Sequence, residues 1–195
     1  YAFLRFDVSG ESQAEKLLSV TQDWDWEHDR LCLDCEAEGQ QTASQVTDIV
    51  NACLERLKNI TGRYPMIYSR KEWVDRKLQV SRMPKVDWWL ATYLKTLPKP
   101  LYTPEMTPPP ALPRGVSNWL IHQTTSRGKS IGAPSYYMDY DRWNGSEEDV
   151  KAYFGYTEQP KPPTPPEPPE SPKPPVDEFP KVGVVIASPS VNIRK

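Results

Sequence analysis

The stretch "RLCLDCEAEG", residues 30–39, is a short apolar run that ends in two carboxylates two residues apart. In a β-strand alternate side chains share a face, so Cys32, Asp34 and Glu36 would share one face, and the leucines and Cys35 the other. Two acids on one face at the C-terminal end of a strand, beside a glycine, suit a site better than a packing surface. Close like charges also raise the pKa of one carboxyl group, which can then act as a general acid.

Other readings of this stretch are a solvated loop, because exposed acids at strand ends are common, and a thiol site. A Cys-x-x-Cys redox motif usually opens a helix, whereas Cys32 and Cys35 lie in a strand-like run. Three residues apart in a strand, the two sulfurs lie on opposite faces and cannot bridge each other. Zinc would need further ligands, and His28 and His122 are isolated in the sequence. We therefore expect buried free thiols, with Cys53 a third on a helix face, and neither a metal nor a cofactor.

The composition indicates one globular domain with additional segments. The chain has 195 residues, of which 26% are charged and 37% hydrophobic, and a net charge of -2. This balance lacks the basic surplus of nucleic-acid-binding proteins. No apolar run approaches the roughly 18 residues of a membrane span, and no secretory signal is visible. The chain begins at Tyr1 inside what reads as a strand, so we expect a fragment of a longer protein.

Proline is the compositional outlier, with 22 residues, half of them between Pro160 and Pro180. The run "PKPPTPPEPPESPKPP" is incompatible with a helix or a central strand, because proline lacks the N–H group and fixes φ. We expect a polyproline II spacer of roughly 60 Å; an SH3 or WW ligand is the alternative. The following "KVGVVIASPSVNIRK" resembles the opening strands of a second domain.

Before this linker, strand patterns alternate with helix patterns. The clearest helix covers residues 42–62, where apolar residues repeat at three and four, Thr42 and Gln45 form a capping box, and Gly62 ends the helix. A further helix is expected at 11–20, with Ser9 or Ser12 as its cap. The other expected helices cover 70–78 and 147–154, and the expected strands cover 1–6, 64–69, 86–94, 118–125 and 135–143, besides the run ending in the two acids.

This order predicts an α/β fold, a parallel β/α barrel that changes character near its end. In such barrels the site lies at the C-terminal ends of the strands. Taken singly, each aromatic residue fits core packing, but aromatic rings beside acids at one rim are typical of a carbohydrate cleft. The candidates at or near such ends are Asp34, Glu36, Tyr68, Tyr93, Gln123 and Asp139, with Trp89 and Tyr137 as further rings for sugar contact.

The ordered set of motifs resembles the glycoside hydrolase family 25 lysozymes, the Chalaropsis-type muramidases. "YAFLRF…ESQAEKLL" resembles a strand and helix of that family, and "LDCE" matches its Asp-x-Glu signature at Asp34 and Glu36. "TGRYPMIYS" and "WWLATY" resemble its next two strands. "WLIHQTTSRGKSIGAPSYYMDYDRWNG" resembles its closing segment, which places Gln123 and Asp139. The likeness covers nearly all of residues 1–155.

The resemblance implies an irregular TIM-like barrel that cleaves the β-1,4 bond between N-acetylmuramic acid and N-acetylglucosamine in peptidoglycan. By the match, Glu36 would be the general acid, and Asp34 and Asp139 supporting carboxylates. Peptidoglycan glycan strands would be the partner of a monomer that is secreted or wall-associated, with no nucleic acid and no membrane span. The implied organisation is a catalytic domain at 1–155, a linker at 156–181 and the start of an SH3-like wall-binding domain at 182–195.

The sequence also departs from the family. The family domain begins with further strands, the first carrying an active-site Asp in "G-I-D-V-S", whereas "FDVSG" at 6–10 follows the Tyr-x-Phe strand. His122 stands where the family usually has Trp, and Asp141 where Asn is common. We therefore expect a barrel without its first strands and with exposed strand edges. A glycan-binding module that does not cut is the alternative function, and the stereochemical outcome stays open between retention and inversion.

Overall fold

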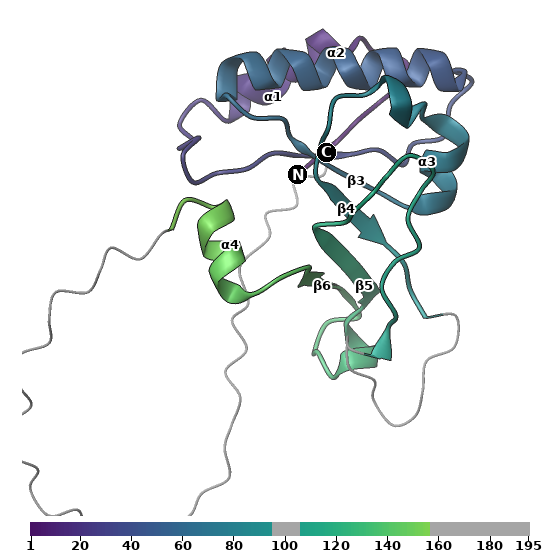
Figure 1. The fold of residues 1–195 in the computed structure, drawn as a ribbon, viewed down its shortest axis with the longest axis vertical. Coiled ribbons are helices and arrows are strands. Elements are labelled where there is room, and N and C mark those ends of the chain that lie inside the picture. Colours follow the sequence, from purple (N-terminus) through teal and green to yellow (C-terminus); the bar gives the residue numbers. More distant parts are fainter. Residues whose placement is uncertain (95–105, 157–195) are drawn as a thin grey trace, which may run out of the picture. The chain divides into compact units, whose positions relative to one another are not determined.

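The computed structural model describes residues 1–94 and 106–156 (Figure 1). The proline-rich linker expected from residue 156 therefore lies, after Tyr156, outside the described residues. The expected SH3-like start at 182–195 also lies outside them, as do residues 95–105.

One curled, six-stranded sheet organises the described chain, and its strand order follows the chain order (Figure 1). The first five strands run parallel, and the sixth runs antiparallel to the fifth. They are β1 (Ala2–Phe3), β2 (Cys32–Asp34), β3 (Met66–Ser69), β4 (Trp88–Ala91), β5 (Ile121–Arg127) and β6 (Tyr137–Trp143). The α/β fold with a parallel sheet that changes direction at its end is thereby confirmed.

Helices α1 (Gly10–Val20), α2 (Ala43–Thr61) and α3 (Lys71–Lys77) connect the first four strands and pack on one face of the sheet, and α4 (Glu147–Tyr153) follows β6. The expected caps are confirmed. The Ser9 hydroxyl accepts a hydrogen bond from the Ser12 N–H, which identifies Ser9 as the N-cap of α1. Thr42 and Gln45 form the capping box of α2, and Gly62 ends that helix with φ 78°, a left-handed conformation that glycine adopts readily.

The first strand is shorter than predicted, because a side chain of α1 replaces its sheet partner. The strand was expected over residues 1–6 and covers Ala2–Phe3. The Gln13 amide accepts from Arg5 N–H and donates to Arg5 C=O, both at 2.8 Å, so the Arg5 backbone is satisfied outside the sheet. Leu4 and Phe6 still enter the core.

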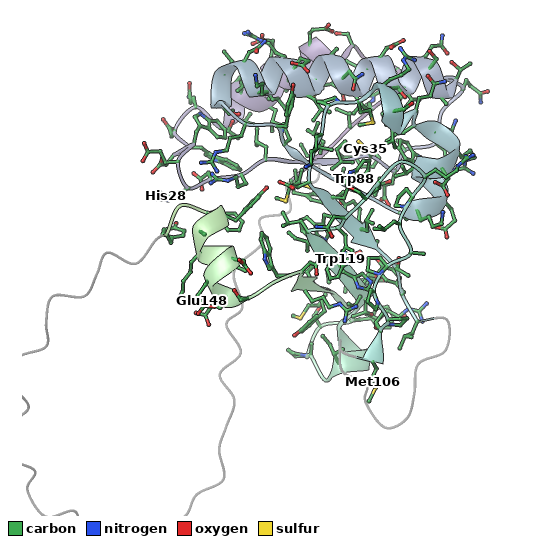
Figure 2. The ribbon with its side chains drawn as sticks, viewed as in Figure 1. His28, Cys35, Trp88, Met106, Trp119 and Glu148 are labelled. Atoms are coloured by element: carbon green, nitrogen blue, oxygen red, sulfur yellow. The ribbon has the colours of Figure 1, made fainter. Side chains whose placement is uncertain are left out.

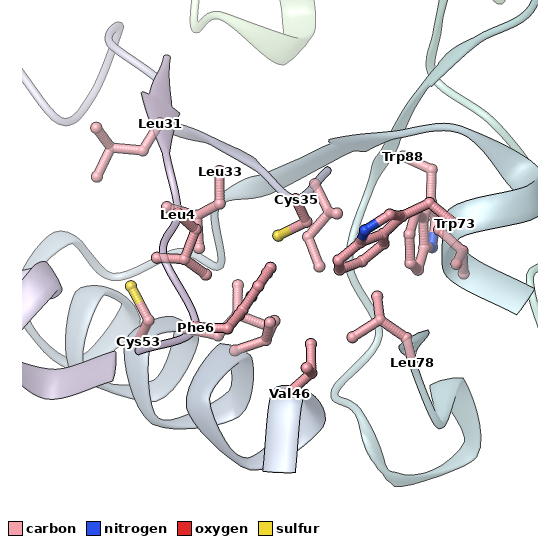
Figure 3. Close-up of a cluster of buried hydrophobic side chains, with 14 of the residues drawn as sticks. Leu4, Phe6, Leu31, Leu33, Cys35, Val46, Cys53, Trp73, Leu78 and Trp88 are labelled. Carbon is pink, nitrogen blue, oxygen red and sulfur yellow. The ribbon is translucent and has the colours of Figure 1, made fainter. Parts of the chain in front are cut away.

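The alternation predicted for residues 30–36 is present in the fold. Leu31, Leu33 and Cys35 pack in the core between the sheet and the helices (Figure 3). Cys32 packs on the opposite, inner face of the sheet, in a smaller cluster with Met66. All three cysteines are buried and free, as expected.

Helices α1 and α2 approach each other closely where α1 begins. A Cβ atom at Gly10 would lie 2.0 Å from the backbone oxygen of Ile49 and 2.7 Å from the nitrogen of Cys53, both in α2. Only glycine fits this contact without a backbone shift, so the start of α1 lies directly on the backbone of α2.

Candidate active site

Three aromatic rings pack against one another on the inner face of the sheet. Tyr1 precedes β1, Tyr68 belongs to β3 and Trp89 to β4. The ring centroids are 5.5 Å apart for Tyr1 and Tyr68, 5.7 Å for Tyr1 and Trp89, and 5.6 Å for Tyr68 and Trp89, each in an edge-to-face arrangement. This aromatic triad joins polar side chains from β2, β5 and β6 into one group, and edge-to-face packing stabilises each pair of rings.

Asp34 is the buried carboxylate of the group. It is 4% exposed, its Oδ2 accepts from the Tyr1 hydroxyl at 2.8 Å, and its buried Oδ1 has no hydrogen-bond partner among the described residues. Burial raises the pKa of Asp34 to about 7, the Tyr1 hydrogen bond opposes this rise, and the charge of Glu36 adds to it. Near neutral pH, Asp34 therefore exchanges between its protonated and ionised forms.

This burial makes stability depend on pH. Because the folded state raises the pKa of Asp34, folded protein keeps a proton that the unfolded chain releases. The contribution of Asp34 to the free energy of unfolding is therefore fully present below about pH 4 and is lost as pH rises to about 7. Asp34→Asn should flatten this part of the pH dependence and stabilise the protein at pH 8 by about 1–3 kcal/mol. Urea unfolding at pH 5 and pH 8 measures both effects.

The matched control for this prediction is Asp23→Asn, which changes an exposed carboxylate. It should leave the difference between the two pH values as it is in the unmodified chain. An Asp34→Asn variant that loses stability between pH 5 and pH 8 as steeply as the unmodified chain would contradict the prediction.

Glu36 lies two residues beyond the end of β2 and is half-buried. Its charge adds to the effect of burial in raising the pKa of both Asp34 and Tyr68. The backbone is held on both sides of Glu36. Cys35 N–H donates to Tyr68 O at 2.9 Å, and the Trp73 indole Nε1 donates to Ala37 O at 3.1 Å. The pairing of Asp34 and Glu36 on one side of the strand stays a prediction.

Gln123 of β5 receives two tyrosine hydroxyls on one oxygen. The Tyr68 hydroxyl donates to Gln123 Oε1 at 2.9 Å, and the Tyr93 hydroxyl donates to the same atom. Burial is the largest cause that raises the pKa of both tyrosines, so both stay protonated donors. These contacts fix the orientation of the Gln123 amide, which is 4% exposed.

Two acids of β6 complete the group. Trp89 Nε1 donates to Asp141 Oδ1 at 2.7 Å. Partial desolvation by the surrounding protein raises the pKa of Asp141 above its ordinary value, the Trp89 hydrogen bond opposes this, and the charge of Asp139 adds to it. Burial also raises the pKa of Asp139, whose charge acts on Tyr93 as well. Both residues keep exposed surface at the rim.

The structure joins five of the predicted site residues by hydrogen bonds and ring contacts and adds two further residues; the five are Asp34, Tyr68, Trp89, Tyr93 and Gln123. Glu36 and Asp139 act on this group through their charge. Tyr137 is 85% exposed, pairs with Arg127 far along β5, and in the described part of the chain makes its ring contact with Tyr136. It is not joined to the hydrogen-bonded group. Tyr1 and Asp141 belong to the group but were not predicted. Asp141 repeats, with Asp139, the spacing of two seen at Asp34 and Glu36, and this signal could have found it.

The chemistry available at this group is that of carboxyl groups, hydroxyl donors and aromatic faces. Within residues 1–94 and 106–156, no cluster of three or more His, Cys, Asp or Glu side chains could hold a metal ion. A search of the same residues finds no helix with the length and apolar character that crossing a membrane requires.

Comparison with known proteins identifies similar sequences and folds. The family model described as "Glycosyl hydrolases family 25" matches residues 1–133. An uncharacterized protein of Escherichia coli O157:H7, YegX, is 26% identical over 153 residues, which are 78% of this chain and 50% of that protein. The chain thus spans about half the length of this curated relative.

Solved structures share the fold. A bacterial lysozyme from Streptomyces coelicolor matches with a TM-score of 0.60 and 22% identity, over 80% of this chain and 71% of that one. A family GH25 lysozyme from Aspergillus fumigatus matches with a TM-score of 0.58 and 21% identity, over 77% and 69% of the two chains. A family 25 glycosyl hydrolase from Bacillus anthracis matches with a TM-score of 0.60 and 23% identity, over 77% and 65%. The curled sheet is therefore that of an irregular TIM-like barrel.

Proposed function

The chain belongs to glycosyl hydrolases family 25, and from this premise we propose that it is an N-acetylmuramidase acting on peptidoglycan. The bond cleaved is the β-1,4 link between N-acetylmuramic acid and N-acetylglucosamine. The observation that carries the proposal is the buried Asp34, with its pKa raised to about 7, beside Glu36 and the aromatic triad. Glycoside hydrolysis generally uses a pair of carboxyl groups, and aromatic ring faces beside such a pair can bind the sugar.

In the proposed reaction, Glu36 donates its proton to the glycosidic oxygen as the bond from that oxygen to the sugar C1 breaks. The positive charge that develops on the sugar ring is stabilised by ionised Asp34 and Asp139. Water then adds to C1 as a hydroxyl group. The remaining proton of this water goes to Glu36, which is thereby protonated again.

Sugar binding is assigned to the rings and the amide around these acids. Trp89 and Tyr93 offer faces for the apolar side of a pyranose ring, and Tyr93 is 43% exposed. Gln123 and the Tyr68 hydroxyl supply polar contacts whose orientation is already fixed by their mutual hydrogen bond. Fixed donors and acceptors bind a ligand with less loss of conformational freedom. Tyr137 would contact glycan beyond this group.

We also propose that the protein works as a monomer outside the cell or at the wall. Residues 156–181 would be an extended spacer, and residues 182–195 would begin an SH3-like wall-binding domain. Tethering of this kind would raise the concentration of the enzyme at its substrate without any new contact in the cleft.

The proposal is tested with purified peptidoglycan sacculi. The full chain is incubated with sacculi, the soluble fragments are reduced with borohydride, and mass spectrometry identifies the reduced sugar. A muramidase leaves N-acetylmuramic acid at the reducing end, whereas a glucosaminidase leaves N-acetylglucosamine there. Reduced N-acetylglucosamine, or no soluble fragments, would overturn the proposal. Sedimentation of the chain with sacculi that stay intact would identify the alternative, a glycan-binding module that does not cut.

A further inference from the structure

A histidine lies fully buried directly behind the candidate active site. His122 of β5 is 0% exposed and pairs in register with Leu90 of β4 and Arg142 of β6. Leu90 belongs to the core under the helices, so His122 points to that outer face. Its neighbour Gln123 points to the inner face and bonds to Tyr68. His122 therefore lies on the face of the sheet opposite to the candidate active site.

Both ring nitrogens of His122 have partners of defined chemistry. The Arg142 guanidinium Nε lies 3.1 Å from His122 Nδ1, and the carbonyl oxygen of Thr92 lies 2.9 Å from His122 Nε2. A guanidinium only donates and a carbonyl only accepts. Nδ1 must therefore be the bare acceptor and Nε2 must carry the proton, so the ring is neutral and held in one tautomer.

Arg142 is in turn held in place by an aromatic ring. Its guanidinium lies 5.7 Å from the centroid of the Trp119 ring, and the same ring meets the His122 ring edge-on at 5.8 Å (Trp119 is labelled in Figure 2). Of the described groups that contact the His122 ring, the charged one is Arg142 on β6. The residue after β4 contributes the Thr92 carbonyl, and the segment before β5 contributes the Trp119 ring.

The partners of His122 are next to site residues in the chain. Thr92 precedes Tyr93, and the Thr92 N–H donates to Gln123 O at 3.1 Å. Both backbone groups of Thr92, its N–H and its carbonyl, are therefore bonded to residues of β5. Arg142 follows Asp141, which accepts from Trp89. The ring of His122 thus connects the backbone just after β4 to β6, at the positions next to Tyr93 and Asp141.

We propose that His122 is a positioning residue: its neutral imidazole, held between the Thr92 carbonyl and the Arg142 guanidinium, fixes the Tyr93–Gln123 and Trp89–Asp141 contacts on the opposite face of the sheet. The consequence for catalysis rests on the muramidase activity proposed above. Protonation of Nδ1 would place an N–H against the Nε–H of Arg142 and release this connection. Burial and the charge of Arg142 already lower the pKa of His122, so the connection persists below the pH at which an ordinary histidine is protonated.

The first arm of the test needs no activity. The chain has two histidines, so ¹⁵N-histidine NMR of the full chain gives two ring systems, which a His28→Gln variant assigns. The expected result is a neutral His122 ring with its proton on Nε2 at pH 6, below the ordinary histidine pKa of about 6.5. A doubly protonated ring, or a proton on Nδ1, would overturn the proposal even if the His122 variants failed to fold.

The second arm compares His122→Leu with His122→Gln. Glutamine keeps one donor and one acceptor at this position, and leucine keeps neither. In His122→Leu the indole N–H resonance of Trp89 should shift, while that of Trp73, bonded to Ala37 on the other side of the sheet, should not. His122→Gln should leave both resonances near their original positions. Unshifted Trp89 in a folded His122→Leu variant would overturn the proposal.

The third arm is kinetic and separates positioning from stability. His122→Leu should lower kcat by about 10- to 10²-fold in the folded protein, and His122→Gln should restore most of it. The acid limb of the activity profile should lie at lower pH in His122→Gln than in the unmodified chain, because the amide does not titrate. Identical kcat and identical pH profiles in all three proteins would overturn the proposal. An unmodified chain without lytic activity would instead refute the proposed function, and the two NMR arms would still decide the role of His122.

Discussion

Replacement of Glu36 by glutamine is expected to lower the rate of muropeptide release from peptidoglycan by about 10²–10⁴-fold, the usual contribution of a general acid. The amide has nearly the shape of the carboxyl group but cannot transfer a proton to the glycosidic oxygen. Folding should be retained, because the backbone around Glu36 is held by contacts that do not involve its side chain, from Tyr68 and Trp73. The initial rate of fragment release, measured beside urea unfolding of the same preparation, gives both quantities.

Glu38→Gln is the matched control, since it makes the same change two residues further along. Glu38 is exposed and forms an ion pair with Arg76, and such surface pairs contribute about 0–1 kcal/mol. Activity should be unchanged in this variant. A Glu36→Gln protein with full activity would remove Glu36 from the role of acid, and equal losses in both variants would indicate a loss of local charge instead.

Replacement of Trp73 by alanine is expected to lower the free energy of unfolding by about 3–5 kcal/mol. The Trp73 side chain is 0% exposed and stacks on Phe6 at 5.4 Å between α3 and the sheet (Figure 3). Its removal leaves a large cavity and also leaves the Ala37 carbonyl without its donor. Since small domains are stable by only about 5–15 kcal/mol, this is a large share of the total. Urea unfolding at fixed pH measures the change.

Trp73→Phe separates the two causes. The phenyl ring keeps much of the buried volume and the contact with Phe6, whereas the indole N–H is lost, so a smaller decrease is expected, of which about 1 kcal/mol belongs to the hydrogen bond. A Trp73→Ala variant that loses less than Trp73→Phe would show that packing at this position does not stabilise the fold as described.

The helix α2 and the strand around Asp34 follow from sequence patterns that are local to each of them. The capping box at Thr42 and Gln45, the glycine stop at Gly62 and the period of the helix between them are local signals, and each was found where expected. The alternation around Asp34 also followed from strand geometry alone, and the structure places Leu33 and Cys32 on opposite faces. These features need no knowledge of distant residues.

Other features depend on partners far along the chain, and sequence patterns do not reveal them. Gln13 shortens β1 because its amide reaches Arg5 across a turn, not through any strand signal. Tyr1 enters the site only because β1 pairs with β2 in a register that brings it to Asp34, 33 residues away. Tyr137 shares a strand with Asp139, yet the irregular pairing of β5 and β6 carries it away from the hydrogen-bonded group.

The order of the sheet has a consequence for how the molecule can be made. Each strand from β2 to β6 pairs with the strand that precedes it in the chain. A chain that leaves the ribosome from its N-terminus can therefore add every new strand to a sheet edge that already exists, and no early strand waits for a late one. Asp34 of β2 would be in place before Gln123, Asp139 and Asp141 are synthesised. Growth of the sheet in one direction would thus assemble the candidate active site from β2 toward β6.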